Sequence, residues 1–162
     1  MQLELIFKFL LLLAIANGTP VIAKKLLGRI LCYPLDAGTT FIDGYPLLGS
    51  SKTIRGVLVS LIAASVCAPV FGFAWTTGFL IGTAAMAGDL ASSFMKRRMG
   101  YPPSSKALGL DQIPESLFPA LACKSLLALT FADVILIVAL FSIGELIASR
   151  LLYKIHLRDK PY

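Results

Sequence analysis

The sequence predicts an all-α fold, an integral membrane bundle of five transmembrane helices. Of its 162 residues, 57% are hydrophobic and only 15% are charged, and the mean hydropathy is +0.80. This composition excludes an ordinary soluble domain and is typical of a polytopic membrane protein. The length leaves room for a single membrane domain over residues 1–162, with no separate soluble domain.

Five apolar segments account for the predicted spans, since a transmembrane helix needs about 20 predominantly apolar residues. They cover residues 3–23, 57–71, 73–94, 113–128 and 131–152. The second and fourth are short. Three prolines inside or near the segments remove backbone hydrogen bonds and predict kinks or early stops: Pro20, Pro69 and Pro119.

The first segment has some features of a cleaved signal peptide, because Ala14, Ile15 and Ala16 resemble a processing site after an apolar run. Glu4 and Lys8 interrupt the expected pattern of a basic start and an unbroken apolar core. Removal of this segment would also place the basic residues after position 96 outside the cell. We therefore expect a retained first span.

The distribution of basic residues predicts the orientation of the bundle. Most of the 15 Lys and Arg residues fall in segments 24–55, 96–106 and 150–160, which five spans place on one side. The positive-inside rule makes this side the cytoplasm, with the N-terminus outside, the C-terminus cytoplasmic, and cytoplasmic loops at about 24–55 and 96–112. The net charge of +6 thus reflects topology, and no nucleic-acid partner is expected.

One carboxylate interrupts the third apolar segment. Asp89 is followed by two serines and by the basic run of residues 96–98, and an acid near the bilayer is a functional-site hypothesis by default. At about 100° per residue, Asp89, Ser93 and Lys96 share one helical face, with Arg97 beside it. This face could hold a metal ion and phosphates where the membrane meets water. The alternative is a structural salt bridge from Asp89 to Lys96 or to a neighbouring helix.

The long loop of residues 36–56 has the composition of a phosphate-binding loop. Its glycines let backbone amides approach an anion, its hydroxyls, including Thr53, donate hydrogen bonds, and Lys52 and Arg55 supply charge at a helix start. It is not a Walker A motif, because Ser51 stands where that motif requires glycine. The alternative is a solvated turn whose basic residues lie against anionic lipid headgroups. Asp36 and Asp43 are expected to serve as turn and cap residues.

A second carboxylate lies at the entrance of the fourth segment. Pro102 and Pro103 force a loop, and the chain returns to the bilayer near residue 113, so Asp111 lies about level with Asp89. Two carboxylates at this level could coordinate Mg²⁺, which takes one or two protein carboxylates and completes its shell with waters and phosphates. The alternative for Asp111 is a helix N-cap. Lys124 is a second intramembrane charge, for which pairing or snorkelling is the expected role.

Four blocks together resemble the lipid cytidylyltransferases, and most closely the archaeal CDP-archaeol synthase family of small five-helix membrane enzymes. The blocks are residues 34–38, 48–56, 88–98 and 110–112. The wider family of phosphatidate cytidylyltransferases has a related series, matched here by Ser93, Lys96, Arg97 and Asp111. Here Gln112 stands where arginine is usual, and no second aspartate closely follows Asp111, which favours the archaeal branch.

The resemblance implies transfer of CMP from CTP to an unsaturated archaeal diether lipid phosphate, an isoprenoid diether of glycerol phosphate, with release of pyrophosphate and with Mg²⁺ as cofactor. The implied catalytic residues are Asp89, Asp111 and Lys96, the two aspartates being the metal ligands. The implied substrate contacts are Lys52, Thr53, Arg55, Ser92, Ser93 and Arg97. The reaction would take place at the cytoplasmic face of the cell membrane, and no protein nucleophile is required because the lipid phosphate is already ionised.

Two other functions compete with this expectation. A CDP-alcohol phosphotransferase also uses acids and metal at this face, but its series of spaced aspartates does not follow Asp36 or Asp43. A small transporter or membrane scaffold would use its basic loops only to bind anionic lipids.

Overall fold

The computed structural model describes residues 2–28 and 30–154. They form five α-helices and one 3₁₀-helix: α1 (Leu3–Leu27), α2 (Ile54–Cys67), η1 (Ala68–Phe71), α3 (Trp75–Arg98), α4 (Gln112–Ala122) and α5 (Phe131–Lys154). In these ranges extended structure is limited to two isolated bridges, Pro34 with Thr53 and Thr40 with Pro46. The predicted all-α class is confirmed.

Four helices are long and apolar enough to cross a membrane: α1, α2 with η1, α3, and α5. The fourth predicted segment behaves differently. Its helix α4 has 11 residues, about 16 Å at 1.5 Å per residue, against a hydrocarbon core of about 30 Å. Pro119 lies inside α4, and the chain continues from Cys123 to Ala128 as hydrogen-bonded turns. The proline cannot donate to the preceding turn, which explains why the helix stops early.

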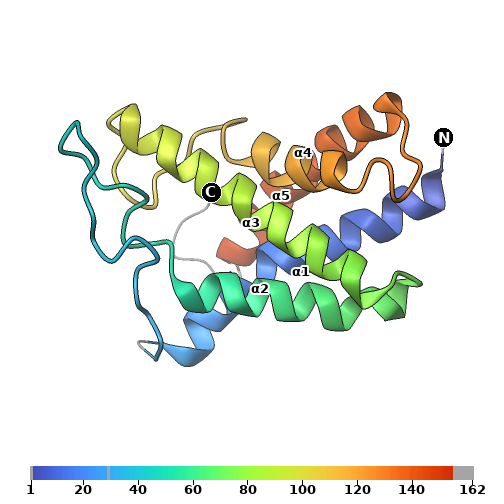
Figure 1. Cartoon of the computed structure of the whole chain (residues 1–162), viewed down its shortest axis with the longest axis horizontal. Helices are drawn as coiled ribbons and strands as arrows, with labels where there is room; N and C mark the ends of the chain where they lie inside the picture. The colour runs from blue at the N-terminus through green and yellow to red at the C-terminus, as the bar shows by residue number, and fades with distance from the viewer. Residues whose placement is uncertain (1, 29, 155–162) are drawn as a thin grey trace.

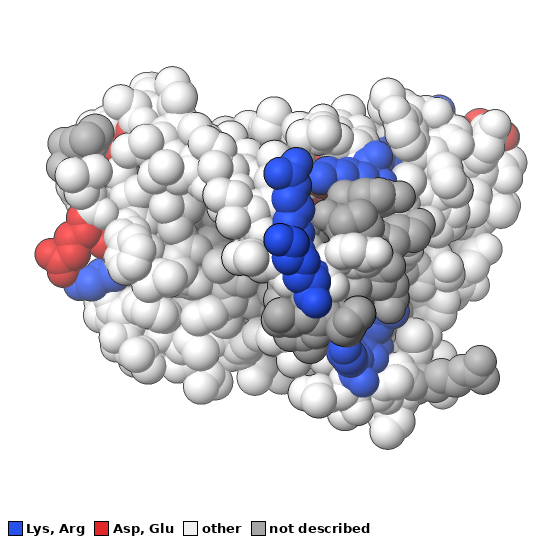
Figure 2. All heavy atoms as spheres, turned by 180° about the vertical axis from the view of Figure 1, so that it is seen from behind, with Lys and Arg blue, Asp and Glu red and all other residues white. Residues whose placement is uncertain are grey.

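The two long connections, residues 28–53 and 99–111, gather at one end of the bundle, which we call the loop end (Figure 1). The N-terminus and the short connections α2–α3 and α4–α5 lie at the opposite end. Helices α1, α3 and α5 all run toward the loop end, and each has basic residues in its last turn. On the face turned away in Figure 1, basic side chains gather in one region of a mostly uncharged surface (Figure 2). Cations at helix C-termini are favoured by the helix dipole.

Helix α3 packs closely against α2 and α4 because glycines line its contact faces. A Cβ added to Gly78 would lie 2.3 Å from the Ala64 carbonyl oxygen of α2. A Cβ added to Gly88 would lie 2.1 Å from the Pro114 carbonyl oxygen of α4. Small residues permit such backbone contact, which is a main source of helix association in membranes. The contact at Gly88 brings the neighbouring residue, Asp89, close to α4.

Gly88→Ala therefore tests the packing of α3 on α4. The added methyl group meets backbone, which cannot move aside as a flexible side chain can, so we expect destabilisation by about 1–3 kcal/mol. Gly144→Ala is the matched control, since a Cβ at this helical position of α5 meets nothing within 4 Å. Thermal unfolding of both variants in detergent measures the difference. A Gly88→Ala protein as stable as the control would contradict the close contact.

Candidate active site

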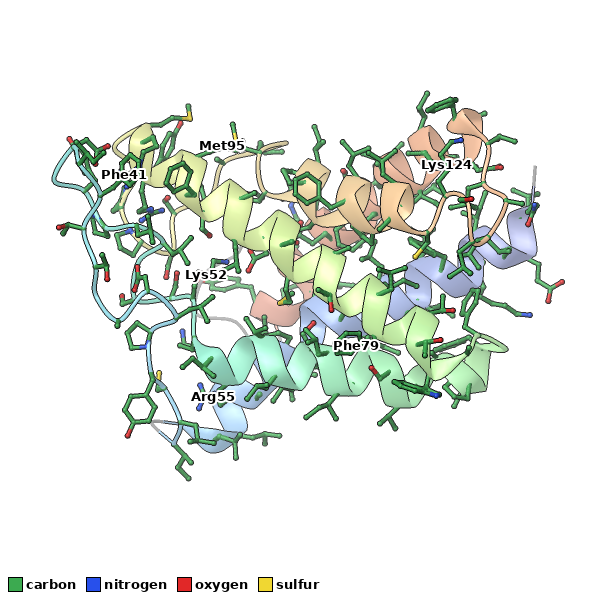
Figure 3. All side chains as sticks on the ribbon, viewed as in Figure 1. Phe41, Lys52, Arg55, Phe79, Met95 and Lys124 are labelled. Carbon is green, nitrogen blue, oxygen red and sulfur yellow. The ribbon has the colours of Figure 1, made fainter. Side chains whose placement is uncertain are left out.

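An ion pair joins the α1–α2 loop to α3. Lys52 Nζ lies 2.5 Å from Asp89 Oδ1, and both side chains are about one-fifth exposed. Lys52 therefore reaches from the loop end into the charged face of α3, as Figure 3 shows. The pair neutralises a carboxylate on a membrane-spanning helix, where an unpaired charge would be costly.

A second ion pair joins the other loop to α3. Lys96 Nζ lies 2.5 Å from Asp111 Oδ1 and also donates to the Ser105 carbonyl oxygen at 3.0 Å. Asp111 accepts a hydrogen bond from the Ala107 backbone N–H at 2.9 Å, and it makes no side-chain cap bond to α4. Lys96 also lies within electrostatic range of Asp89. The structure thus brings the predicted Asp89, Asp111, Lys96 and Lys52 into one charged cluster, in which a different lysine binds each acid.

Arg97 brings unpaired donor groups to this cluster. Only 2% of the residue is exposed, and within the described residues its Nε and Nη1 groups have no hydrogen-bond partner. A Cβ on Gly49 would lie 3.8 Å from Arg97 Cδ and 3.4 Å from Pro103 Cγ, so Arg97 lies where the two long loops meet. Leaving buried N–H donors unpaired is costly. The arrangement is therefore suited to an anionic ligand that supplies the missing acceptors.

Two other predicted substrate contacts, Thr53 at the end of the α1–α2 loop and Arg55 in the first turn of α2, have structural partners. Arg55, 4% exposed, donates from Nη1 to the carbonyl oxygens of Gly28 at 3.0 Å and Ile30 at 2.6 Å. Thr53 is the N-cap of α2 and accepts from the Gly56 N–H at 3.2 Å. These residues hold the end of α1 against the start of α2. Their hydrogen bonds order the loop from which Lys52 extends.

The predicted serines lie inside the bundle. Ser92 and Ser93 are 0% and 2% exposed, and Ser92 Oγ donates to the Asp89 carbonyl oxygen at 2.9 Å. Lys124 lies at the far end from Lys52 and Arg55 (Figure 3). Its ammonium is 4.3 Å from the centroid of the Phe131 ring, so a cation–π contact accounts for this charge.

The α1–α2 loop is held in shape by its own acids. Asp36 accepts hydrogen bonds from three backbone N–H groups: Gly38 at 3.1 Å, Leu48 at 2.9 Å and Gly49 at 2.9 Å. Burial of the carboxylate acts to raise the pKa of Asp36, but these bonds outweigh it, and the pKa lies below its ordinary value. Asp36 therefore serves as the expected turn residue, and it fixes the backbone that covers Arg97.

A separate contact ties the tip of the loop to the end of α3. Arg98 donates to Asp43 Oδ1 and to the Pro46 carbonyl oxygen, each at 2.5 Å. Its guanidinium also lies 4.7 Å from the Phe41 ring centroid and 4.9 Å from that of Phe94. The Arg98 guanidinium thus attaches the loop to α3 through Nη1 and Nη2 and leaves only its Nε without a partner among the described residues, whereas Arg97 has two such donor groups, Nε and Nη1.

Sequence reasoning missed Glu115. This residue lies on α4, is 9% exposed, and has its carboxyl group in electrostatic range of that of Asp89. Two features would have revealed it. Glu115 follows Asp111 by four residues, which puts the two on one face of a helix. Gly88, directly before Asp89, permits the backbones of α3 and α4 to approach closely. The prolines on either side, Pro114 and Pro119, hid the helical spacing.

The acids at the loop end supply carboxylate oxygens. Within the described residues, no group of three or more His, Cys, Asp or Glu side chains is placed so that it could hold a metal ion by itself. Together, the fold and this cluster define a multi-pass helical membrane protein with a charged, largely buried site set into one end of the bundle.

Comparison with known proteins gives the family. The model of the CarS-like family, CDP-archaeol synthase, matches residues 2–162. A CDP-archaeol synthase of Pyrobaculum calidifontis is 32% identical over 153 residues, covering 91% of each chain. One of Thermofilum pendens is 32% identical over 155 residues, covering 91% of this chain and 76% of that protein. This chain belongs to the CDP-archaeol synthase family.

A solved structure agrees with this assignment. It is described as an intramembrane enzyme for archaeal membrane lipids biosynthesis, and it matches with a TM-score of 0.76 at 31% identity over 87% of this chain and 90% of that one. The resemblance predicted from the four sequence blocks is therefore confirmed at the level of family and fold.

The lowered pKa of Asp36 predicts how the loop responds to pH. A carboxylate with a lowered folded pKa stabilises the loop above the pKa of the unfolded chain, and the stabilisation is lost as the pH falls through the folded value. In hydrogen–deuterium exchange we expect the Leu48 and Gly49 amides to be protected at neutral pH and to lose protection only in acid, below the ordinary range of aspartate.

Asp36→Asn should remove that protection at neutral pH, speeding exchange at these amides by about tenfold or more, since a hydrogen bond to a charged group contributes about 1.5–3 kcal/mol. Glu4→Gln, which changes an exposed carboxylate on α1 at the opposite end of the bundle, is the control. Equal exchange in wild type and Asp36→Asn would show that the carboxylate does not hold this backbone.

Proposed function

We propose that this protein transfers CMP from CTP to an unsaturated archaeal diether lipid phosphate, releasing pyrophosphate and forming CDP-archaeol. Its family membership supports the reaction class. The single observation that supports it from the site is Arg97, a buried guanidinium with two unpaired donor groups at the same end of the bundle as the ion-paired Lys52 and Lys96. Guanidinium groups match phosphate oxygens in geometry and charge.

The reaction explains why the site needs this concentration of cations. An oxygen of the lipid phosphate forms a bond to the α-phosphorus of CTP while the bond from that phosphorus to the β-phosphate oxygen breaks, and pyrophosphate leaves with the electron pair. The nucleophile and the leaving group are both anionic and repel each other. Cationic side chains already in place lower the energy of the transition state in which these charges meet. No residue of the chain has to act as nucleophile.

Mg²⁺ is the proposed cofactor, and it would neutralise phosphate charge during the transfer. The donor set fits it, because Mg²⁺ prefers oxygen ligands and commonly takes one or two carboxylates together with phosphates and waters. Asp89 is the first proposed ligand. The second proposed ligand is Asp111, the acid that the sequence predicts at the start of the fourth segment.

The membrane position of the site suits substrates from two phases. Asp89 lies about 21 Å along α3 from Trp75, at about 1.5 Å per residue, and therefore in the loop-end part of a core about 30 Å thick. We propose that this end faces the cytoplasm, as the positive-inside rule predicts, so that CTP enters from water. The lipid phosphate would approach sideways from the bilayer.

The direct test uses the purified full-length protein with labelled CTP, Mg²⁺ and the diether lipid phosphate. We expect labelled CDP-lipid and an equal amount of pyrophosphate. A CDP-alcohol phosphotransferase would instead consume CDP-lipid and release CMP, and a transporter or scaffold would give neither product. Absence of CDP-lipid with diether and diacyl phosphates alike would contradict the proposal.

Arg97→Gln should lower kcat/KM for CTP by about 10²-fold, because each charged hydrogen bond lost from a buried site costs about 1.5–3 kcal/mol. Arg97→Lys keeps the charge but not the forked donor geometry, so it should fall between Arg97→Gln and wild type. Lys124→Ala, which removes a cation at the opposite end, is the control and should retain wild-type kinetics. Wild-type kinetics in Arg97→Gln would remove this residue from the site.

Asp89→Asn should lower kcat by at least about 10²-fold, the size of effect seen when a strong electrostatic contribution is lost from an active site. The side chain keeps its shape but leaves Lys52 without its ion-pair partner, so the unfolding midpoint should also fall, and the rate is measured at a temperature at which the variant is folded. A single-turnover assay with saturating CTP separates this effect from weakened binding. Normal turnover would contradict the role of Asp89.

A further inference from the structure

The end of α1 and the turn that follows it expose apolar side chains beyond the length of helix that a membrane needs. Counted from Leu3 at about 1.5 Å per residue, a hydrocarbon core about 30 Å thick ends near residue 22 of α1. Residues 26–28 and 30–33, which we call the post-α1 turn, lie beyond that point. Five of them are large, apolar or aromatic, and 39–78% exposed: Leu26, Leu27, Ile30, Leu31 and Tyr33. An exposed apolar patch of this kind is typical of a contact surface for a protein or a membrane.

A backbone hydrogen bond places the post-α1 turn at the level where α2 enters the membrane. The Ile54 N–H donates to the Tyr33 carbonyl oxygen at 3.1 Å, and Ile54 is the first residue of the 18-residue span that α2 and η1 form. That span is about 27 Å long, so nearly all of it is needed to cross the hydrocarbon core. Tyr33 therefore lies near the boundary between acyl chains and headgroups, the depth at which tyrosine side chains are enriched.

The shape of the post-α1 turn is held from inside the protein. Leu31 has a φ of +52°, in the left-handed region that residues other than glycine rarely adopt. Such strain persists only where the surrounding structure fixes the backbone. The buried Arg55 does this, because its Nη1 donates to the carbonyl oxygens of Gly28 at 3.0 Å and Ile30 at 2.6 Å. A guanidinium from the first turn of α2 thus supports a backbone whose side chains lie on the surface.

The charge beside the post-α1 turn indicates what covers it. Lys24 and Lys25 are exposed in the last turn of α1, directly before the turn. Basic residues next to exposed apolar ones are typical of segments that lie in an anionic lipid surface, where the apolar groups enter the acyl boundary and the ammonium groups reach the phosphates. A second copy of this chain is less suited, since it carries a net charge of +6 and would bring the same lysines against these.

We propose that Lys24, Lys25 and the post-α1 turn form an interfacial anchor that binds the headgroup layer of an anionic leaflet. The contact needs neither CTP nor Mg²⁺, so it goes beyond the transfer reaction. The Leu35 N–H donates to the Lys52 carbonyl oxygen at 2.8 Å, and the anchor is thereby joined to the stretch of loop that carries Lys52. Binding of the anchor to the leaflet fixes the height of this stretch relative to the lipid headgroups.

Tryptophan fluorescence tests the depth of the anchor in a bilayer. The chain has one tryptophan, Trp75, at the start of α3, and Trp75→Phe removes its signal. In that background, Tyr33→Trp places an indole in the anchor. Ile42→Trp is the matched control, because Ile42 is 96% exposed and belongs to the same connection between α1 and α2. Its neighbour Phe41 lies farther than Arg55 from the N-terminal end of the molecule (Figure 3).

Both proteins are reconstituted in vesicles of equal parts phosphatidylcholine and phosphatidylglycerol with bromine on the upper part of the acyl chains. Bromine quenches an indole on contact, and interfacial side chains lie about 5–10 Å deep, so we expect Tyr33→Trp to be quenched at least about twice as strongly as Ile42→Trp. Acrylamide in the aqueous phase should give the reverse order. Equal quenching of the two variants by bromine, or stronger quenching of Tyr33→Trp by acrylamide, would overturn the proposal. Weak quenching of Tyr33→Trp by both agents would also overturn it, since a protein surface would then cover the turn.

The two lysines are tested by placing bromine on only one of the two lipids. We expect brominated phosphatidylglycerol to quench the anchor indole more strongly than brominated phosphatidylcholine. Lys24→Gln combined with Lys25→Gln should lower the ratio of the two quenching efficiencies by about twofold or more, since each basic residue near an anionic surface adds about a fivefold attraction. Lys8→Gln combined with Lys124→Gln removes two charges near the opposite end and should keep the ratio. Elution volume establishes that each variant is folded. An unchanged ratio without Lys24 and Lys25, or an equal loss in the control, would contradict the anionic preference.

Discussion

The ion pairs of α3 are the interactions on which the loop end depends. A helix that crosses a membrane cannot carry Asp89 and Lys96 without compensation, because uncompensated charge is costly at that depth. Lys52 and Asp111 supply it, and each comes from a different loop. Both loops are therefore held against α3 by an ion pair. The ion pairs that lower the free-energy cost of these charges in a bilayer also bring the residues of the site together.

The glycines of α3 set the second constraint. Gly78 and Gly88 allow α2 and α4 to touch the backbone of the middle helix, and association of helices in a membrane depends on such close packing. Because Gly88 directly precedes Asp89, packing and chemistry are coupled at adjacent positions. The site lies at one end of a bundle that contains four helices long enough to cross a membrane and one short helix, α4.

Apolar runs were sufficient to predict that five α-helices form, but the length of the fourth run did not show whether its helix crosses the membrane. Hydropathy alone did not show that α4 has only 11 residues, and the signal for its early stop was Pro119, which lacks the N–H that would bond to the preceding turn. The charged residues of the site were also predictable, but their partners were not. Asp89 and Asp111 were expected to share a cation, whereas each has its own lysine, and Arg55 binds the carbonyl oxygens of a turn 25–27 residues away in sequence. Such pairings depend on the tertiary approach of segments, which spacing along one helix does not reveal.

The central claim is that the loop end, around Arg97, receives the nucleotide. Hydrogen–deuterium exchange of the wild-type protein with and without CTP and Mg²⁺ tests it most directly, because bound ligand protects the backbone of the loops that enclose it. The account predicts slower exchange in residues 47–53 and 99–111, and unchanged exchange in the α2–α3 and α4–α5 connections at the other end. Protection confined to those distant connections, or unchanged exchange throughout at saturating CTP, would contradict it.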